Sequence, residues 1–247
     1  MENHQQLPDL KITGTSNSAG GVFGKVKITG EGYVEDDLEC LEFSCTGVAD
    51  IKGNFQAADV SVRGVMTVAG NTQADKTVIN GEADFDGEVS VKEMRCNGVA
   101  NLKKNLISEE VRVWGNVSVQ GNCETERFLV KGGFTTQGLL NAGNIDVQMY
   151  WPCQAAEIGG ERITVKKSAS LKNMLKSIWG LFQSDPPQPK LTADVIEGDE
   201  IYLEHTEAKI VRGNHITIGP GCEIELVEYK RSFQQAKDTQ VHDSKEI

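Results

Sequence analysis

The sequence has no long apolar run. Nowhere do its 247 residues approach the roughly 18 consecutive apolar residues of a membrane-spanning helix. The first residues, MENHQQLPDLKITG, also have no apolar stretch of the kind that signal peptides need. We therefore expect a cytoplasmic protein, one that meets a membrane only as a peripheral protein on its inner face.

Positive charge and aromatic side chains are also scarce. Lys and Arg number 25 against 36 Asp and Glu, which gives a net charge of −11, and aromatic residues make up 6% of the chain. Nucleic-acid binding needs clustered cations that displace counterions, so we expect no nucleic-acid partner. Neither GxxxxGK[ST] nor GxGxxG before a helix is present, so we expect no nucleotide and no cofactor.

Close pairs of metal-ligating residues are missing. The six cysteines form no CxxC pair, and the four histidines stand apart at positions 4, 205, 215 and 242. Structural zinc sites normally show paired ligands, and disulfides are rare in a reducing compartment. Five acids surround His205 in IEGDEIYLEHTE and could suggest a metal, but they alternate with strand residues. We predict no metal site, and cysteines that serve as small buried hydrophobes.

Glycine, by contrast, recurs with a strict period. Seven glycines stand at a 17-residue interval, namely Gly30, Gly47, Gly64, Gly81, Gly98, Gly115 and Gly132. A fixed period of this order is the signature of a solenoid, in which each repeat packs on its neighbours. The spacing therefore predicts stacked structural repeats.

Apolar residues recur at fixed places within each 17-residue unit. Counted from the glycine as position 1, they fill positions 3, 5, 9, 11, 14 and 16 from Gly47 to Gln148, where the exceptions are Thr or Ser and none is charged. Each of the three pairs has the spacing of a strand with one inward face. The pattern predicts an all-β fold, a three-sided parallel β-helix with 17-residue coils. Right-handed crossovers are the default for parallel strands.

The residues between these pairs form the corners of the predicted coil. Position 8 carries asparagine at Asn54, Asn71, Asn105 and Asn122, and asparagines stacked at one corner predict an amide ladder along the axis. An asparagine-lined ligand site is the alternative. Positions 12 and 13 are mostly charged, and we interpret them as a solvated face rather than a catalytic row.

The period ends near Gln148, and the chain divides into five predicted segments. These are a flexible N-terminal segment at 1–19, the β-helix at 20–165, an amphipathic helix with a Pro-rich linker at 166–190, a C-terminal β region at 191–229 and a disordered tail at 230–247. The strand spacing of the C-terminal region fits either larger coils of the same β-helix or a small separate β-domain.

Residues 169–182 have the periodicity of a helix rather than of a strand. The candidate contact residues on this predicted helix are Leu171, Leu175, Ile178, Trp179 and Phe182. Nearby lysines make the segment basic, so it could bind an anionic membrane surface or a protein client. The alternative is that it packs on a flank or an end of the β-helix.

Three repeat segments share one motif, with two glycines at a six-residue spacing around alternating Val and Ile. These segments are GVADIKGNF, GVMTVAGNT and GNVSVQGNC. The motif resembles that of the bactofilin family, bacterial polymer-forming cytoskeletal proteins, and the extended C-terminal region looks like that of Bacillus-type members. The resemblance implies a right-handed β-helix that polymerises through its end coils without nucleotide. It also implies a scaffold for cell-envelope, cell-shape or motility machinery.

The sequence thus predicts a non-enzymatic scaffold whose main partner is a second copy of itself. The end coils of a β-helix expose unpaired strand edges, which invite another chain. Two alternatives remain. One is a β-helix carbohydrate-active lyase or hydrolase, which rests on fold analogy alone. The other is a non-polymerising adaptor that uses the helix at 169–182.

Overall fold

The protein is described by a computed structural model that covers residues 7–168 and 188–247. Within these residues it is built of strands and turns, with no helix. The strands are β1 (Leu10–Ser18), β2 (Gly21–Val34), β3 (Leu38–Ile51), β4 (Phe55–Val68), β5 (Thr72–Ile79), β6 (Glu82–Phe85), β7 (Val89–Cys96), β8 (Val99–Leu102), β9 (Leu106–Val113), β10 (Asn116–Val119), β11 (Cys123–Lys167), β12 (Leu191–Leu203), β13 (Thr206–Ile218), β14 (Glu223–Gln235) and β15 (Gln240–Glu246). The all-β prediction is confirmed.

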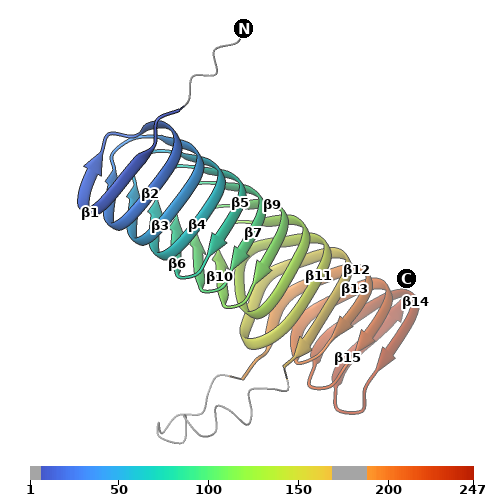
Figure 1. Ribbon diagram of the computed structural model, residues 1–247. Helices are drawn as coiled ribbons and strands as arrows, with labels where there is room; N and C mark the ends of the chain where they lie inside the picture. The colour runs from blue at the N-terminus through green and yellow to red at the C-terminus, as the bar shows by residue number, and fades with distance from the viewer. Residues whose placement is uncertain (1–6, 169–187) are drawn as a thin grey trace, which may run out of the picture. The chain divides into compact units, whose positions relative to one another are not determined.

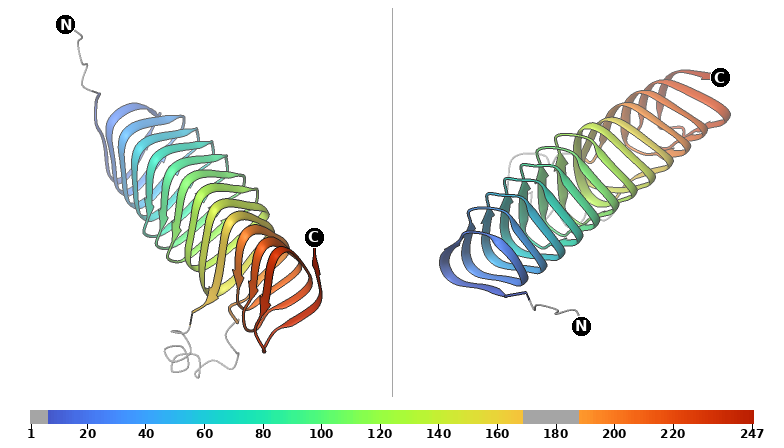
Figure 2. Two further views of the ribbon diagram at one scale, coloured as in Figure 1. Left: turned by 90° about the vertical axis from the view of Figure 1, so that its right-hand side faces the viewer. Right: turned by 90° about the horizontal axis from the view of Figure 1, so that it is seen from above.

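The chain forms two compact units, Met1–Gly121 and Asn122–Ile247. In unit 1 the strands stack in the order β1-β2-β3-β4-β5-β7-β9, and β4-β6-β8-β10 form a second path. In unit 2 the order is β11-β12-β13-β14-β15. Neighbouring strands pair in parallel, as the successive coils in Figures 1 and 2 show. Each unit is therefore a parallel β-solenoid, consistent with the predicted right-handed, three-sided coil.

The 17-residue period is the register of the coils in unit 1. Gly30 lies beside Gly47, and Gly47 lies beside Gly64. Only the pairing of β1 with β2 differs, because Leu10 lies beside Val26, one position short of the period, and this offset is kept through Ser18 and Val34. Each residue of the regular coils therefore contacts its own counterpart in the next coil.

The inward positions form the core that the sequence predicts. From Gly47 to Gln148 all of them are buried except Ser108 and Thr125, which are half-buried. Both hydroxyls donate to backbone carbonyls, Ser108 Oγ to Lys92 O at 3.0 Å and Thr125 Oγ1 to Arg127 O at 3.3 Å. A polar group at the edge of the core is thereby satisfied.

The first position of each 17-residue repeat is glycine because this corner of the coil leaves no room for a side chain. A Cβ atom at Gly81 would overlap the carbonyl oxygen of Gly64, and one at Gly98 would overlap that of Gly81. Gly47 also has a φ of 127°, which is accessible to glycine and rare for other residues. Close approach of successive backbones therefore selects glycine at this corner.

Two predictions for the ends of the chain are wrong. The sequence predicts a flexible segment at 1–19, but β1 pairs with β2 along its whole length. It also predicts a disordered tail at 230–247, but β14 continues to Gln235 and β15 pairs with it. These strands are mostly exposed and polar. Backbone pairing does not need apolar side chains, and apolar periodicity therefore gives no signal for them.

The C-terminal region is neither a separate domain nor a set of larger coils. Cys153 in β11 lies beside Leu191 in β12, so the stack continues directly across the intervening segment. The next coil is shorter than the 17-residue period, since Leu191 lies beside Thr206. The predicted boundaries at residues 165 and 191 therefore do not divide the solenoid of unit 2, because β11 and β12 on either side of the intervening segment pair directly.

The predicted helix at 169–182 lies outside the described residues. Across the ranges that are described, no helix is long and apolar enough to span a membrane.

Candidate functional site

The site residues predicted from the sequence fall into two groups, one outside and one inside the described residues. Leu171, Leu175, Ile178, Trp179 and Phe182 lie outside the described residues, so their role stays a prediction. Six of the seven repeat glycines, from Gly30 to Gly115, lie against the backbone of the preceding coil at the solenoid corner, where their role is structural. The candidate sites within the described residues are the open strand edges β1 and β15, the hydrogen-bonded ladders at the corners, and two surface hollows in unit 2.

β1 forms an open edge of unit 1. It pairs with β2 on one side, and no strand among the described residues pairs with its other side. Its polar side chains contact the coil beneath, since Thr15 Oγ1 donates to Glu31 Oε2 at 3.4 Å and Asn17 Nδ2 donates to Glu35 Oε1 at 3.0 Å. An edge of this kind presents backbone donors and acceptors that a further strand can satisfy.

β15 forms an open edge of unit 2, and it is chemically different. Most of its side chains are charged or titratable, namely His242, Asp243, Lys245 and Glu246. Within the described chain no strand lies beyond it. Charged side chains on an edge strand oppose pairing with another sheet.

An ionic network fastens β15 to β14. Glu228 is buried at 7% exposure and accepts from Lys245 Nζ at 2.8 Å and from Arg212 at 2.6 Å. Arg212 also reaches Glu197 at 3.4 Å. Hydrogen bonds from Lys245 and then Arg212 lower the pKa of Glu228 below its usual value of 4.5. The carboxylate is therefore held in its charged form at neutral pH.

Position 8 forms a hydrogen-bonded ladder, although it joins side-chain oxygens to backbone N–H groups rather than one asparagine amide to the next. Each side-chain oxygen accepts a backbone N–H from the residue 17 positions later. The steps are Asp37 to Asn54 at 2.6 Å, Asn54 to Asn71 at 2.9 Å, Asn71 to Glu88 at 2.9 Å, Glu88 to Asn105 at 3.2 Å and, in unit 2, Asn122 to Leu139 at 3.0 Å. The prediction named asparagine alone and missed Asp37 and Glu88, although both stand at position 8. These oxygens are used by the fold, which argues against the alternative of an asparagine-lined ligand site.

The cysteines are buried free thiols, as predicted. Burial raises the pKa of Cys40, Cys123 and Cys153 to about 12, and that of Cys45 and Cys222 to about 11. The pKa of Cys96 is also raised by burial. Because the thiolate is the nucleophile and the metal ligand, burial and the raised pKa both disfavour such chemistry at these cysteines.

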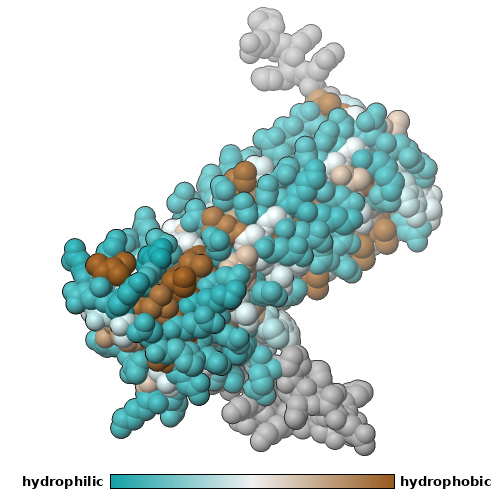
Figure 3. Space-filling view, turned by 180° about the vertical axis from the view of Figure 1, so that it is seen from behind, coloured by the Kyte–Doolittle hydropathy of each residue, from teal (hydrophilic) through white to brown (hydrophobic). Residues whose placement is uncertain are grey.

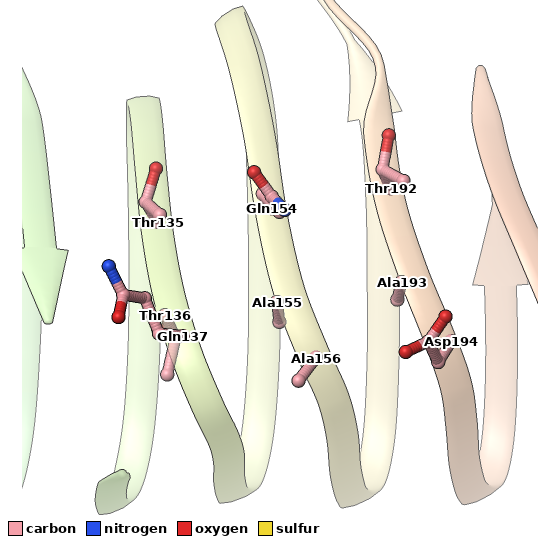
Figure 4. Close-up of a pocket in the computed structure, with 9 residues that line it drawn as sticks. All are labelled: Thr135, Thr136, Gln137, Gln154, Ala155, Ala156, Thr192, Ala193 and Asp194. Atoms are coloured by element: carbon pink, nitrogen blue, oxygen red, sulfur yellow. The ribbon is translucent and has the colours of Figure 1, made fainter. Parts of the chain in front are cut away.

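A shallow hollow of about 390 Å³ lies on one face of unit 2. Thr135, Gln154 and Thr192 stand in a row on neighbouring coils, as Figure 4 shows. The one carboxylate in its lining, Asp194, forms an ion pair with Lys209 at 2.7 Å. The lining therefore offers hydroxyl and amide groups for hydrogen bonding.

A second groove, of about 460 Å³, follows the glycine corner of unit 2. Gly160, Gly198 and Gly213 lie side by side along it. Two of its acids already have partners: Glu197 is near Arg212, and Asp199 Oδ1 accepts from Asn214 at 2.7 Å. Among the described residues no group of three or more His, Cys, Asp or Glu side chains could hold a metal ion.

The exposed surface is mainly hydrophilic on the face drawn in Figure 3, with a few apolar patches. The exposed large apolar residues include Trp114 and Trp151, each 46% exposed. Trp151 packs near Tyr150, with ring centroids 6.4 Å apart.

The chain is similar to two proteins of Bacillus subtilis (strain 168). It is 40% identical over 111 residues to "Uncharacterized protein YhbF", a match that covers 44% of this chain and 42% of that protein. It is 40% identical over 97 residues to "Uncharacterized protein YhbE", a match that covers 39% of this chain and 38% of that protein. The matches thus span about two fifths of these relatives. No protein-family model matches the chain, and no solved structure matches it.

Proposed function

We propose that this protein is a non-enzymatic, bactofilin-like scaffold that self-associates through the strand edges of its solenoid units. The observation that carries the proposal is the edge strand β1, whose outer side has no strand partner among the described residues. The solenoid fold is compatible with the family that the repeat motif resembles.

Self-association of this kind uses the same physics as the solenoid itself. Within each unit a coil is held by parallel backbone pairing and by apolar side chains stacked in columns, such as Val26 on Leu10 and Ile28 on Ile12. A second chain at the edge continues both interactions. No step needs nucleotide hydrolysis, since strand pairing and apolar burial are themselves favourable.

We further propose that the assembled scaffold positions cell-envelope, cell-shape or motility machinery at the inner face of the membrane. This part rests on the resemblance of the repeat motif. Residues 169–182 are the candidate segment for contact with a membrane or a client, because this segment carries apolar and basic residues.

The purified full-length protein should self-associate without nucleotide. Sedimentation velocity over a wide concentration range should show species heavier than the 26.9 kDa chain, and added ATP or GTP should leave them unchanged. Negative-stain electron microscopy of the same samples shows the form of the assembly. A strictly monomeric protein at high concentration would contradict the proposal.

A further inference from the structure

We infer that Asn80 is a site of spontaneous deamidation, at which the backbone nitrogen of Gly81 displaces the side-chain amide group. The reaction needs water as its only co-reactant, and it does not depend on the proposed function. Asn80 and Gly81 form the bend between β5 and β6. Asn97 and Gly98 form the same bend one coil later, between β7 and β8. Both asparagines are exposed, so water reaches the two pairs.

Glycine is the neighbour that makes this reaction feasible. An asparagine deamidates when the backbone nitrogen of the next residue reaches its side-chain carbonyl carbon, and glycine has no Cβ atom to obstruct that approach. The chain holds two Asn-Gly steps, and both lie at the glycine corner of unit 1. The described residues offer no hydrogen-bond acceptor to the N–H of Gly81 or of Gly98. The attacking nitrogen is therefore not held by the backbone ladder.

The two asparagines differ in one contact. Asn97 Nδ2 donates a hydrogen bond to Asn80 Oδ1 at 2.8 Å. That oxygen gains negative charge when the nitrogen of Gly81 adds to the carbonyl carbon, and a fixed donor stabilises the charged oxygen more than the neutral one. No donor to Asn97 Oδ1 is found within the part of the chain that the structure describes. Asn80 is therefore the more reactive asparagine, and Asn97 promotes its reaction.

The reaction runs through a cyclic imide. The nitrogen of Gly81 gives its proton to water and bonds to Cγ of Asn80, while the bond from Cγ to Nδ2 breaks. Nδ2 takes up a proton from water and leaves as ammonia. A second water molecule then opens the ring, at the Cγ carbonyl to give aspartate or at the backbone carbonyl to give isoaspartate. The net reaction consumes water and releases ammonia.

The two products affect the corner differently. Aspartate keeps the oxygen that accepts from Asn97, and the cation of Arg63, at the same repeat position one coil earlier, favours the new charge. Isoaspartate lengthens the main chain beside Gly81, where the backbone of Gly64 leaves no free space. Deamidation therefore adds a charge to the corner and, in the second product, strains the contact between coils.

The test follows both asparagines in the folded full-length chain during incubation at neutral pH. Mass spectrometry of peptides prepared at low pH measures conversion of the amide to the acid, and labelling by isoaspartate methyltransferase identifies isoaspartate. Asn80 should convert about fivefold faster than Asn97, the effect of one neutral hydrogen bond. In the chain unfolded by urea the contact is lost, and the two asparagines should convert at similar rates.

Two variants test the contact itself. Asn97→Ala removes the donor and should slow conversion of Asn80 about fivefold. Asn101→Ala is the matched control, because Asn101 Nδ2 donates to Asp84 Oδ1 at 2.8 Å between the same two coils. It should leave the rate at Asn80 unchanged. Circular dichroism checks that each variant keeps its β structure.

Three results would overturn the inference. These are an Asn80 that stays intact in the folded chain, equal rates at Asn80 and Asn97 in the folded wild type, and an unchanged rate at Asn80 in folded Asn97→Ala. The comparison within the wild type needs no variant, so it decides the matter if Asn97→Ala does not fold.

Discussion

The space beside Gly81 is closed by the carbonyl oxygen of Gly64, and a methyl group on Gly81 would overlap that oxygen. The oxygen belongs to the backbone of the preceding coil, so the clash cannot be relieved by turning a side chain. At Gly143 the nearest atom to an added methyl carbon is Glu126 O at 3.2 Å, a tight contact rather than an overlap. The two glycines thus differ in how closely the preceding coil approaches.

Gly81→Ala should therefore destabilise the protein by about 3 kcal/mol, the upper range for overpacking. Gly143→Ala is the matched control and should cost less. Urea unfolding followed by circular dichroism measures both. Equal midpoints for the two variants would show that the coils can separate at this corner without cost.

The inward and corner residues also show which parts of the fold the sequence could predict. Val62, Ile79 and Cys96 share position 16 and are all fully buried, because the register repeats each side chain's environment once per coil. Such a pattern is visible without a structure. The hydrogen-bonded role of Glu88 was equally accessible from its position in the repeat, since it stands between Asn71 and Asn105 in the ladder.

At the level of elements, the edge strands β1 and β15 could not be predicted in the same way. An edge strand has one paired side and few buried side chains, so its apolar period is weak. Gln240 N donates to Cys222 O at 2.9 Å and Ile247 N donates to Tyr229 O at 3.0 Å, and such backbone bonds leave little trace in side-chain periodicity. The sequence predicts that the candidate site consists of unpaired strand edges at the end coils. It does not identify which residues form those edges.

The attachment of β15 to β14 should depend on pH through Glu228. Its pKa is lowered in the folded protein by Lys245 and Arg212, so its contribution to stability is present above the unfolded value near 4.5 and is lost as the pH falls through the lowered value. Glu228→Gln should therefore lower the thermal unfolding midpoint at pH 7, and the difference from the wild type should disappear in strong acid.

Two controls apply to this prediction. Glu223→Gln changes an exposed glutamate on the same strand and should have little effect at either pH. High salt should reduce the effect of Glu228→Gln at pH 7 only partly, since Glu228 is buried. A difference between Glu228→Gln and the wild type that persists unchanged below pH 3 would contradict the ionic origin.

At the scale of the whole molecule, the division into two compact solenoid units implies that a destabilising substitution unfolds the coils near it and leaves the other unit folded. Within unit 1 each coil packs on the coils before and after it. Phe43 in β3, for example, packs edge-to-face on Phe55 in β4, with the ring centroids 5.0 Å apart. Stability in such arrays is approximately a sum of repeat terms and nearest-neighbour terms, so unfolding can be confined to part of the chain. A globular domain with one shared core would instead respond as a unit.

Phe43→Arg puts a charge in place of a ring that is 2% exposed, which should cost about 4 kcal/mol or more. Hydrogen exchange measured by mass spectrometry should show lost protection in β2, β3 and β4, while β12 and β13 of unit 2 keep theirs. Thr46→Arg places the same side chain at an exposed position of β3 and should change neither region. Uniform loss of protection from β2 to β13 would mean that the two units unfold as one, and the nearest-neighbour description would then be wrong for this chain.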